Sequence, residues 1–525
     1  MAEPEPVAAA QAIRRARLAG VAAGVLGAGV AMASSAVIHT LLPWVPFPPL
    51  EVADAVVRLT PGGVATFFIE ALGHLALPLA VVAAAVGFAG LSALLGLAMP
   101  WLTDRLGGRP VRAAAVLALV PLGVSLAAFD PDPGSVSLGA YAVSLLVVLA
   151  LSARAAGRAY ERLVREPESP AGLASDPVRR DVTRGLLWAG AGLALGWVGL
   201  GRVLLGRPNP GDRPLELARV STAPRPSPAT GDAAFDGIPG LASEITPLGS
   251  FYVVDEELID PDVDPGSWSL EIGGLVDNPY RLSYEELTSL PAVERYVTLE
   301  CISNPVGGDL ISTAKWTGVC LADLLERAGV RDGAVEVVSS AIGGYSDSVP
   351  IDQAMLASSL VAIGMNGHVL PREHGFPARL LVPGLYGMKQ PKWLERIEVV
   401  DRPYTGYWES RGWSKAAAVR TMSRIDAATM ASDGGFVVAG VAFAGDRGIS
   451  TIEVSTDAGE TWQEAQLKTA LSSEAWRLWR FPLADPGARV IVRAVDGEGE
   501  VQIQEPASPH PSGATGYDEV QTDGP

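Results

Sequence analysis

Residues 297–308 read VTLECISNPVGG, and this stretch is the key to both the fold and the chemistry of the chain. Its first part, together with Tyr296, is typical of the end of a strand, and Cys301 then opens a loop that carries Pro305 and two glycines. Loops that leave a strand often hold functional residues, and glycine lets the backbone approach a ligand closely. Cys301 is therefore a candidate nucleophile, disulfide partner or metal ligand, and the stretch itself leaves all three open.

Composition narrows the classes of function. The chain has 525 residues, two cysteines and a formal net charge of −18. Such a charge without a basic stripe excludes nucleic acid as a partner. Two cysteines without a C-x-x-C pair exclude zinc fingers, iron–sulfur clusters and covalently attached haem. We expect the other cysteine, Cys320, to be a small buried residue where a helix begins, and a Cys301–Cys320 disulfide is the alternative.

The first part of the chain is predicted to lie in a membrane. Apolar runs at about 18–42, 75–99, 113–129, 138–152 and 185–205 approach the roughly 20 residues that a spanning helix needs. We therefore expect an α-helical membrane domain of about five spans over residues 1–205. These spans contain almost no charged side chains, which argues against a transporter.

The arginines predict the orientation of these spans. They cluster before the first span, after the second, and between the fourth and fifth. The positive-inside rule then places the N-terminus in the cytoplasm and everything after the fifth span outside the plasma membrane. Arg179 and Arg180 are either such inside arginines or a degenerate twin-arginine export signal. His39 and His74 would lie near the outer face, where a shared haem is an alternative reading.

Three regions follow the membrane domain. Residues 206–236 are rich in Pro, Gly, Ser and Thr and predict a flexible linker. Residues 237–410 predict a mixed α and β domain, with a capping box at Ser283 and a helix at 321–328 that ends at Gly329. Residues 411–505 hold short strands separated by Asp/Gly turns, which is typical of a β-sandwich. The polar residues 506–525 are expected to be a disordered tail.

A second stretch of interest is HGFPARLLVPGLYGMKQPKW, residues 374–393. It combines His374 and Arg379 with a glycine-rich loop and then Lys389 and Lys392. Cationic side chains and exposed backbone N–H groups of this kind bind anionic groups such as phosphate. The alternative is an ordinary strand between loops, with Arg379 in a surface ion pair.

Together the two stretches resemble the sulfite oxidase family of molybdenum enzymes, over about residues 238–504. The resemblance implies an α+β molybdopterin-binding domain followed by an immunoglobulin-like sandwich through which two chains form a homodimer. It also implies Mo-molybdopterin as the cofactor, with the thiolate of Cys301 as the protein ligand of the metal. The cofactor contacts that it implies are Phe251, Tyr252, Cys301, Ser340, His374, Arg379, Gln390, Pro391 and Lys392.

The chain departs from this family where the substrate would bind. The family places arginines around the metal, but this chain has Pro305 and Val306 after the cysteine and Val253 and Val254 upstream. Trp413 stands at the position of the family's active-site tyrosine. We expect the substrate pocket to be lined by Asn304, Trp408, Arg411 and Trp413, with Arg411 as one cation, and we expect a substrate less charged than sulfite.

The resemblance thus predicts a membrane-anchored enzyme that transfers an oxygen atom to or from a small molecule of the sulfite, sulfoxide or N-oxide type. Its electrons would pass to or from a separate partner, a quinone or a cytochrome, on the outer face of the membrane. Two alternatives remain. One is a cofactor-free membrane-anchored binding or assembly protein, and the other is a membrane subunit for electron transfer.

Overall fold

The computed structural model describes residues 6–42, 45–60, 76–129, 138–164, 209–217, 219–222, 225–255, 260–431, 434–484 and 486–522, together with Val64, Phe68, Leu72, Leu187 and Ala194. These residues form two compact units, which we describe separately. The first unit holds most of residues 1–207, and the second holds nearly all of the chain from Pro208 onward.

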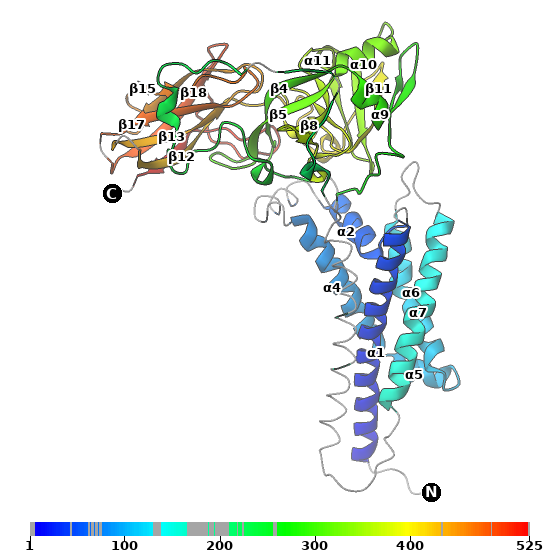
Figure 1. The fold of residues 1–525 in the computed structure, drawn as a ribbon. Helices are drawn as coiled ribbons and strands as arrows, with labels where there is room; N and C mark the ends of the chain where they lie inside the picture. The colour runs from blue at the N-terminus through cyan, green and yellow to red at the C-terminus, as the bar shows by residue number, and fades with distance from the viewer. Residues whose placement is uncertain are drawn as a thin grey trace, which may run out of the picture. The chain divides into compact units, whose positions relative to one another are not determined.

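The first unit is entirely helical (Figure 1). Its helices are α1 (Pro6–Leu41), α2 (Pro48–Leu59), α4 (Ala76–Gly96), α5 (Met99–Arg105), α6 (Pro110–Ala128) and α7 (Leu138–Val164). Among the described residues, four helical stretches are long and apolar enough to cross a membrane, at Ala10–His39, Leu79–Gly96, Pro110–Ala128 and Tyr141–Val164. Our expectation of five spans is not shown, because nearly all of the run at 185–205 lies outside the described residues, as do His74, Arg179 and Arg180.

Glycines bring α1 and α4 into close contact. A Cβ atom on Gly20 would lie 2.0 Å from the carbonyl oxygen of Gly96, and one on Gly24 would lie 2.1 Å from that of Ser92. Small residues at helix interfaces allow such backbone approach, which is how apolar helices pack in lipid. His39 near the end of α1 uses Nδ1 for a 2.7 Å hydrogen bond with the carbonyl of Val45.

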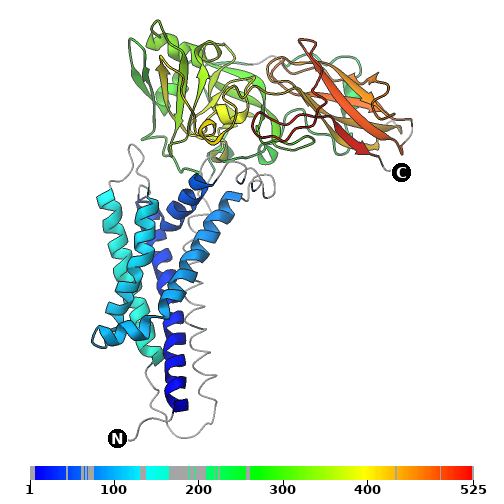
Figure 2. The ribbon, with the colours of Figure 1, turned by 180° about the vertical axis from the view of Figure 1, so that it is seen from behind.

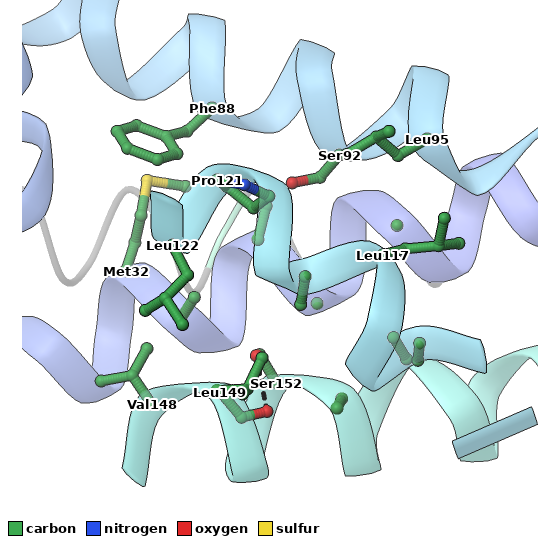
Figure 3. Close-up of a pocket in the computed structure, with 18 of the residues that line it drawn as sticks. Met32, Phe88, Ser92, Leu95, Leu117, Pro121, Leu122, Val148, Leu149 and Ser152 are labelled. Atoms are coloured by element: carbon green, nitrogen blue, oxygen red, sulfur yellow. Dashed lines mark hydrogen bonds between the residues drawn. The ribbon is translucent and has the colours of Figure 1, made fainter. Parts of the chain in front are cut away.

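A cavity of about 110 Å³ lies among α1, α4, α6 and α7. Met32 and Phe88 point toward one another at one side of it (Figure 3). Its hydroxyl groups belong to serines such as Ser125 and Ser152, which donate hydrogen bonds to carbonyls of their own helices at 3.0 and 3.1 Å. The wall of this cavity is therefore mainly apolar.

The second unit begins with two β-sheets and three short helices. The first sheet has the order β1 (Val220–Ser221), β4 (Ala292–Glu300), β5 (Ile311–Cys320), β8 (Leu360–Met365), β10 (Arg379–Leu381), with β9 (His368–Val369) beside β8. The second has the order β3 (Tyr280–Ser283), β2 (Ser269–Gly274), β11 (Leu394–Val400), β6 (Glu336–Ala341), β7 (Ser346–Pro350). The helices are α9 (Tyr284–Ser289), α10 (Leu321–Ala328) and α11 (Ile351–Ala354). A core of Leu, Ile and Val side chains from both sheets and α10 holds this part together.

Local signals in the sequence explain how two of these helices begin and end. Ser283 and Glu286 form the expected capping box at the start of α9, where the Ser283 side chain accepts from the Glu286 N–H and Glu286 accepts from that of Ser283. Helix α10 ends at Gly329, whose φ of 72° is the left-handed conformation that glycine adopts without strain. Both predictions are confirmed.

The unit ends in a sandwich of two four-stranded sheets, as expected (Figure 2). One sheet has the order β12 (Met422–Met430), β13 (Phe436–Phe443), β17 (Arg477–Pro482), β16 (Gln466–Leu467). The other has the order β15 (Gln463–Glu464), β14 (Ile449–Ser455), β18 (Arg489–Asp496), β19 (Asp518–Gln521). Val438, Ile452, Trp479 and Val490 are fully buried between them.

We expected a flexible linker at 206–236 and a disordered tail at 506–525, and both expectations are wrong for the residues that the structure describes. In the predicted linker, Val220–Ser221 adds to the first sheet in parallel with β4, and the carbonyl of Ala234 accepts a 2.9 Å hydrogen bond from Arg480. In the predicted disordered tail, β19 pairs with β18. Both segments are ordered by backbone hydrogen bonds to distant strands. Such bonds cannot be predicted from the local amino-acid composition.

The alternative of a Cys301–Cys320 disulfide is excluded by the sheet. The N–H of Cys301 bonds to the carbonyl of Leu310 at 2.9 Å, next to the start of β5, whereas Cys320 ends that ten-residue strand. At about 3.3 Å per residue the two cysteines are separated by roughly 30 Å, far beyond the approximately 7 Å that a disulfide spans. Cys320 is half-buried rather than fully buried as expected.

Candidate active site

Cys301 follows the last ladder pair of β4 and β5, Glu300 with Ile311. The carbonyl of Cys301 accepts a 2.9 Å hydrogen bond from the N–H of Asn304, which closes a tight turn. Its sulfur lies 2.9 Å from the hydroxyl of Ser303. The strand end and the turn together fix the direction of the thiol.

The thiol faces a cavity within the second unit, and three other segments complete its wall. These are the upstream segment 251–255, the cationic segment 373–392 and an aromatic group. The lining residues are Phe251, Tyr252, Val253, Val254, Asp255, Leu299, Cys301, Ile302, Ser303, Tyr345, Glu373, His374, Arg379, Gly387, Met388, Lys392, Trp408 and Trp413. Of the thirteen residues that we predicted for the site, the structure brings eight together here: Phe251, Tyr252, Cys301, His374, Arg379, Lys392, Trp408 and Trp413.

The cationic part of the wall is held by short turns. The turn Arg372–His374 and strand β10 place His374 and Arg379 in the cavity wall, both almost fully buried. Arg379 donates to the carbonyls of His374 and Gln390, each at 3.3 Å, and its guanidinium lies 5.2 Å from the ring of Trp316. Gly375 has a φ of 107°, and a Cβ there would lie 2.9 Å from Lys392, so glycine is required for this close packing.

His374 is kept neutral by its surroundings. Burial, together with the positive charges of Arg379 and Lys392, lowers its pKa to about 3. Its Nε2 is buried and has no hydrogen-bond partner among the residues that the structure describes. A buried polar atom without a partner costs free energy, so Nε2 is suited to a ligand that enters the cavity.

Aromatic side chains form the rest of the wall. Tyr345 donates a 2.6 Å hydrogen bond to the carbonyl of Met388, which fixes the ring beside the cavity. Trp408 and Trp413 meet edge to face with their ring centres 6.4 Å apart. The indole Nε1 of Trp413 is buried without a partner among the described residues. This indole N–H is therefore a donor that the aromatic part of the wall can offer to a ligand.

Five predicted site residues do not line the cavity. Asn304 accepts from the N–H of Leu310 at 3.0 Å and donates to Glu300 at 3.0 Å, so it braces the Cys301 loop. Gln390 accepts from the N–H of Val382 and donates to the carbonyl of Leu385, bracing the glycine-rich loop. Pro391 and Ser340 lie in backbone pairs beside the site. Their cofactor contacts therefore stay predictions.

The fifth, Arg411, was expected to supply one cation to the substrate pocket. Its guanidinium instead lies 3.5 Å from the ring centre of Tyr407 and donates to the carbonyl of Tyr407 at 2.9 Å. Lys389 was also expected among the cations that face an anion, but it is fully buried in an ion cluster with Asp347 and Glu409. Neither side chain lines the cavity.

The charged groups that do line the cavity are balanced. Arg379 and Lys392 are its two cations, and Asp255 and Glu373 are its two carboxylates. Val253 and Val254 lie in the wall as apolar residues. The cavity therefore has no cation in excess among the described residues.

Glu300 is a polar group that sequence reasoning missed. It immediately precedes Cys301 and is fully buried, and this burial raises its pKa to about 7. One carboxylate oxygen accepts from Asn304, and the other has no partner among the described residues. The only available signal was a glutamate at the end of a strand that is buried on both faces.

Two domain families match the second unit of the chain. Residues 257–408 match the model of the oxidoreductase molybdopterin binding domain, and residues 414–508 match that of the Mo-co oxidoreductase dimerisation domain. The mitochondrial sulfite oxidase of Mus musculus is 32% identical over 320 residues, which is 50% of this chain and 58% of that protein. The sulfite oxidase of Arabidopsis thaliana is 29% identical over 50% of this chain and 83% of its own length.

One further relative and one solved structure are also similar to this chain. The uncharacterized oxidoreductase YuiH of Bacillus subtilis (strain 168) is 35% identical over 29% of this chain and 74% of its own length. The crystal structure of the sulfane dehydrogenase SoxCD from Paracoccus pantotrophus aligns with a TM-score of 0.48 and 22% identity, over 58% of this chain and 87% of that one. The chain spans somewhat more than half the length of the mammalian sulfite oxidases, at 57–58%. With both domain models matched in order and with these relatives, the chain belongs to the sulfite oxidase family of molybdopterin-dependent oxidoreductases.

Proposed function

We propose that this chain is a membrane-anchored molybdenum enzyme that transfers an oxygen atom to or from a small, weakly charged substrate, such as a sulfoxide or an N-oxide. The observation that carries the substrate class is the cavity wall beyond the proposed phosphate-binding residues. Val253, Val254, Trp408 and Trp413 make it apolar and aromatic, and among the described residues no Arg or Lys besides Arg379 and Lys392 lines the cavity.

The residues in the cavity fit the Mo-molybdopterin cofactor of the family. His374, Arg379 and Lys392 lie in one wall, and the Nε2 atom of His374 is buried and open to a new partner. Gly387 lets the chain approach closely, because a Cβ there would lie 3.2 Å from the hydroxyl of Tyr252. We propose that these three side chains hold the phosphate of the cofactor and that Cys301 supplies the thiolate ligand of the metal.

The bound cofactor supplies two-electron oxygen-atom transfer, and the chain supplies binding and orientation. The negative charge of a bound phosphate favours the protonated form of His374, in which Nε2 can donate to a phosphate oxygen. Tyr345, Met388 and Trp408 shield the site from water, and Trp413 offers its indole N–H to an oxygen of the substrate. Such a donor in a dry site is stronger than in water, which favours a substrate with one exposed oxygen.

Sulfite is a poor fit to this wall. A hydrogen bond to a charged group contributes about 1.5–3 kcal/mol, so a site without substrate-facing arginines loses that amount for each one missing. Arg411, the nearest candidate in the sequence, is turned toward Tyr407. A neutral sulfoxide or N-oxide oxygen needs one donor, and Trp413 can provide it.

We place the catalytic domain outside the plasma membrane, anchored by the helical unit, on the basis of the arginine distribution. We further propose a homodimer through the sandwich and a separate electron partner, a quinone or a cytochrome. The proposed domains are residues 1–205, 206–236, 237–410, 411–505 and 506–525. The described parts of 206–236 and 506–525 are ordered.

The test uses full-length chain purified in detergent from a host that makes the cofactor. We expect about one molybdenum per chain, and oxygen-atom transfer with sulfoxides or N-oxides and artificial electron donors that exceeds sulfite oxidation. Cys301→Ser should abolish activity while the fold survives, and Cys320→Ser is the matched control that should retain it. Protein without molybdenum would contradict the proposed enzyme. Faster turnover of sulfite than of the neutral substrates would contradict the proposed substrate class.

A further inference from the structure

The ammonium group of Lys392 has all of its hydrogen-bond donors in use. It is almost fully buried and contacts a carboxylate oxygen of Asp255, the carbonyl of Val254 at 3.1 Å and the carbonyl of Glu373 at 3.2 Å. An ammonium carries three N–H donors, and three acceptors therefore satisfy it. A phosphate oxygen can bond to Lys392 only after one of these acceptors leaves.

The side chain of Asp255 is the acceptor that moves most easily. The other two acceptors are main-chain carbonyls, and moving them would require a change in the backbone of the cavity wall. Asp255 needs only a rotation about its own side-chain bonds, and its side chain is 19% exposed. Asp255 and Lys392 both line the cavity, so this rotation would occur inside the proposed cofactor site.

The charge around Asp255 also disfavours a second anion. Asp260 lies close enough for Asp255 and Glu373 to raise its pKa, which together with burial, the largest cause, reaches about 6. Lys392 and Arg372 oppose this shift. A phosphate monoester with between one and two negative charges would meet the same repulsion from these carboxylates.

We propose that Asp255 is an internal counter-anion that occupies Lys392 in the cofactor-free chain and is displaced from it when the phosphate of the cofactor binds. Asp255 thereby sets how tightly the chain takes up its cofactor. This inference rests on the proposed role of His374, Arg379 and Lys392 at the phosphate end of the site. It assigns a role to a residue that was absent from the predicted site.

The test measures uptake of molybdopterin by full-length chain purified from a host that cannot make it. Bound pterin is extracted, oxidised and measured by fluorescence across a range of added molybdopterin, so the readout is independent of catalysis. In Asp255→Asn, the amide keeps an acceptor for Lys392 and removes the competing charge. We expect half-maximal loading at a concentration roughly fivefold lower than for the natural chain, because one partly exposed ion pair is lost.

Glu373→Gln is the matched control. It also removes one negative charge from the cavity wall, but the Glu373 side chain accepts from Asn209 at 2.7 Å, and only its carbonyl contacts Lys392. We expect a smaller change in loading, because the contact with Lys392 survives. Equal shifts in both variants would overturn the specific role of Asp255 in favour of a general charge effect.

A second measurement keeps the test valid if the variant is less stable than the natural chain. The melting temperature should rise on loading by a larger increment in Asp255→Asn than in the natural chain, since tighter binding stabilises the folded state more. Asp255→Ser should show the same direction. Unchanged loading and an unchanged increment would overturn the inference alone. A natural chain that takes up no pterin would contradict the proposed site, and the inference with it.

Discussion

At the scale of the residue, the buried ion cluster of Lys389, Asp347 and Glu409 has a consequence for stability. Lys389 contacts both carboxylates, and its Nζ also donates to the carbonyl of Ser348 at 3.2 Å. One ammonium thus serves two buried carboxylates. Burial raises the pKa of Asp347 to about 6, with the charge of Glu409 adding to the shift and Lys389 opposing it.

Asp347→Asn should therefore change how stability depends on pH. The carboxyl of Asp347 has an ordinary pKa of 3.8 when unfolded and about 6 when folded, so the folded chain holds its proton more tightly. The stability that this bound proton contributes is fully present below pH 3.8 and is lost as the pH rises through 6. The free energy of unfolding should fall by at most about 3 kcal/mol over this range in the natural chain, and this fall should be absent in the variant. Urea unfolding followed by tryptophan fluorescence between pH 4 and 7 measures this, with the exposed Asp332→Asn as control. Parallel curves for the natural chain and Asp347→Asn would count against the assignment.

The residues that the family resemblance implied for the centre of the site lie together in one cavity, whereas several that it implied for the edges do not. Cys301, His374, Arg379 and Lys392 meet in one cavity because a strand end and two short turns carry them there. Arg411 lies on the single turn Glu409–Arg411, where its direction is set by the ring of Tyr407. Such a contact depends on packing around a short turn, which spacing in the sequence does not encode.

At the scale of the element, the strand β19 and the segment before it support the cavity wall. The ring of His510 meets that of Trp413 edge to face at 5.0 Å, and the carbonyl of Pro511 accepts a 2.9 Å hydrogen bond from Ser414. Gly513 packs against Tyr386, where a Cβ would lie 2.2 Å from the hydroxyl. The polar composition of this segment predicted disorder, because its contacts are with distant residues rather than with an apolar face of its own.

A chain that ends after Glu505 should be less stable than the full chain. It loses the four ladder pairs of β19 with β18 and the bond from the N–H of Ile425 to Asp518 at 2.8 Å. At about 1 kcal/mol for each hydrogen bond, we expect the melting temperature of the second unit to fall by about 5–10 °C. The exposed pair of Arg489 and Glu519 supplies the control, since Glu519→Ala should have little effect. An unchanged melting temperature after truncation would show that the segment contributes no stability.

At the scale of the whole molecule, the order of the parts could be predicted from the sequence because each part has a distinct composition. Long apolar runs mark the helical unit, and alternating short strands mark the sandwich. The boundaries between the parts were predicted less well. Proline and serine around β1 suggested a tether, yet β1 completes the sheet that carries Cys301.

The side of the membrane on which each loop lies is the property of the whole chain that most needs a test. Arg105, Arg109 and Arg112 lie around the connection from α5 to α6, whereas residues 130–137 between α6 and α7 contain two aspartates and no basic residue. The positive-inside rule places the first connection in the cytoplasm and the second outside. Alkaline phosphatase, which is active only outside, serves as the reporter when it is fused after selected residues.

Fusions after Phe129 and Thr222 should be active, and fusions after Gly107 and Val164 should be inactive, if five spans carry the catalytic domain outward. A fluorescent protein that folds only in the cytoplasm should give the opposite pattern and serves as the control. The comparison of Val164 with Thr222 decides between four and five spans, because only a span between them places the two on opposite sides. If both fusions are inactive, the catalytic domain lies in the cytoplasm with the end of α7, which would contradict the proposed location. If both are active, the proposed orientation of α7 and the fifth span are wrong.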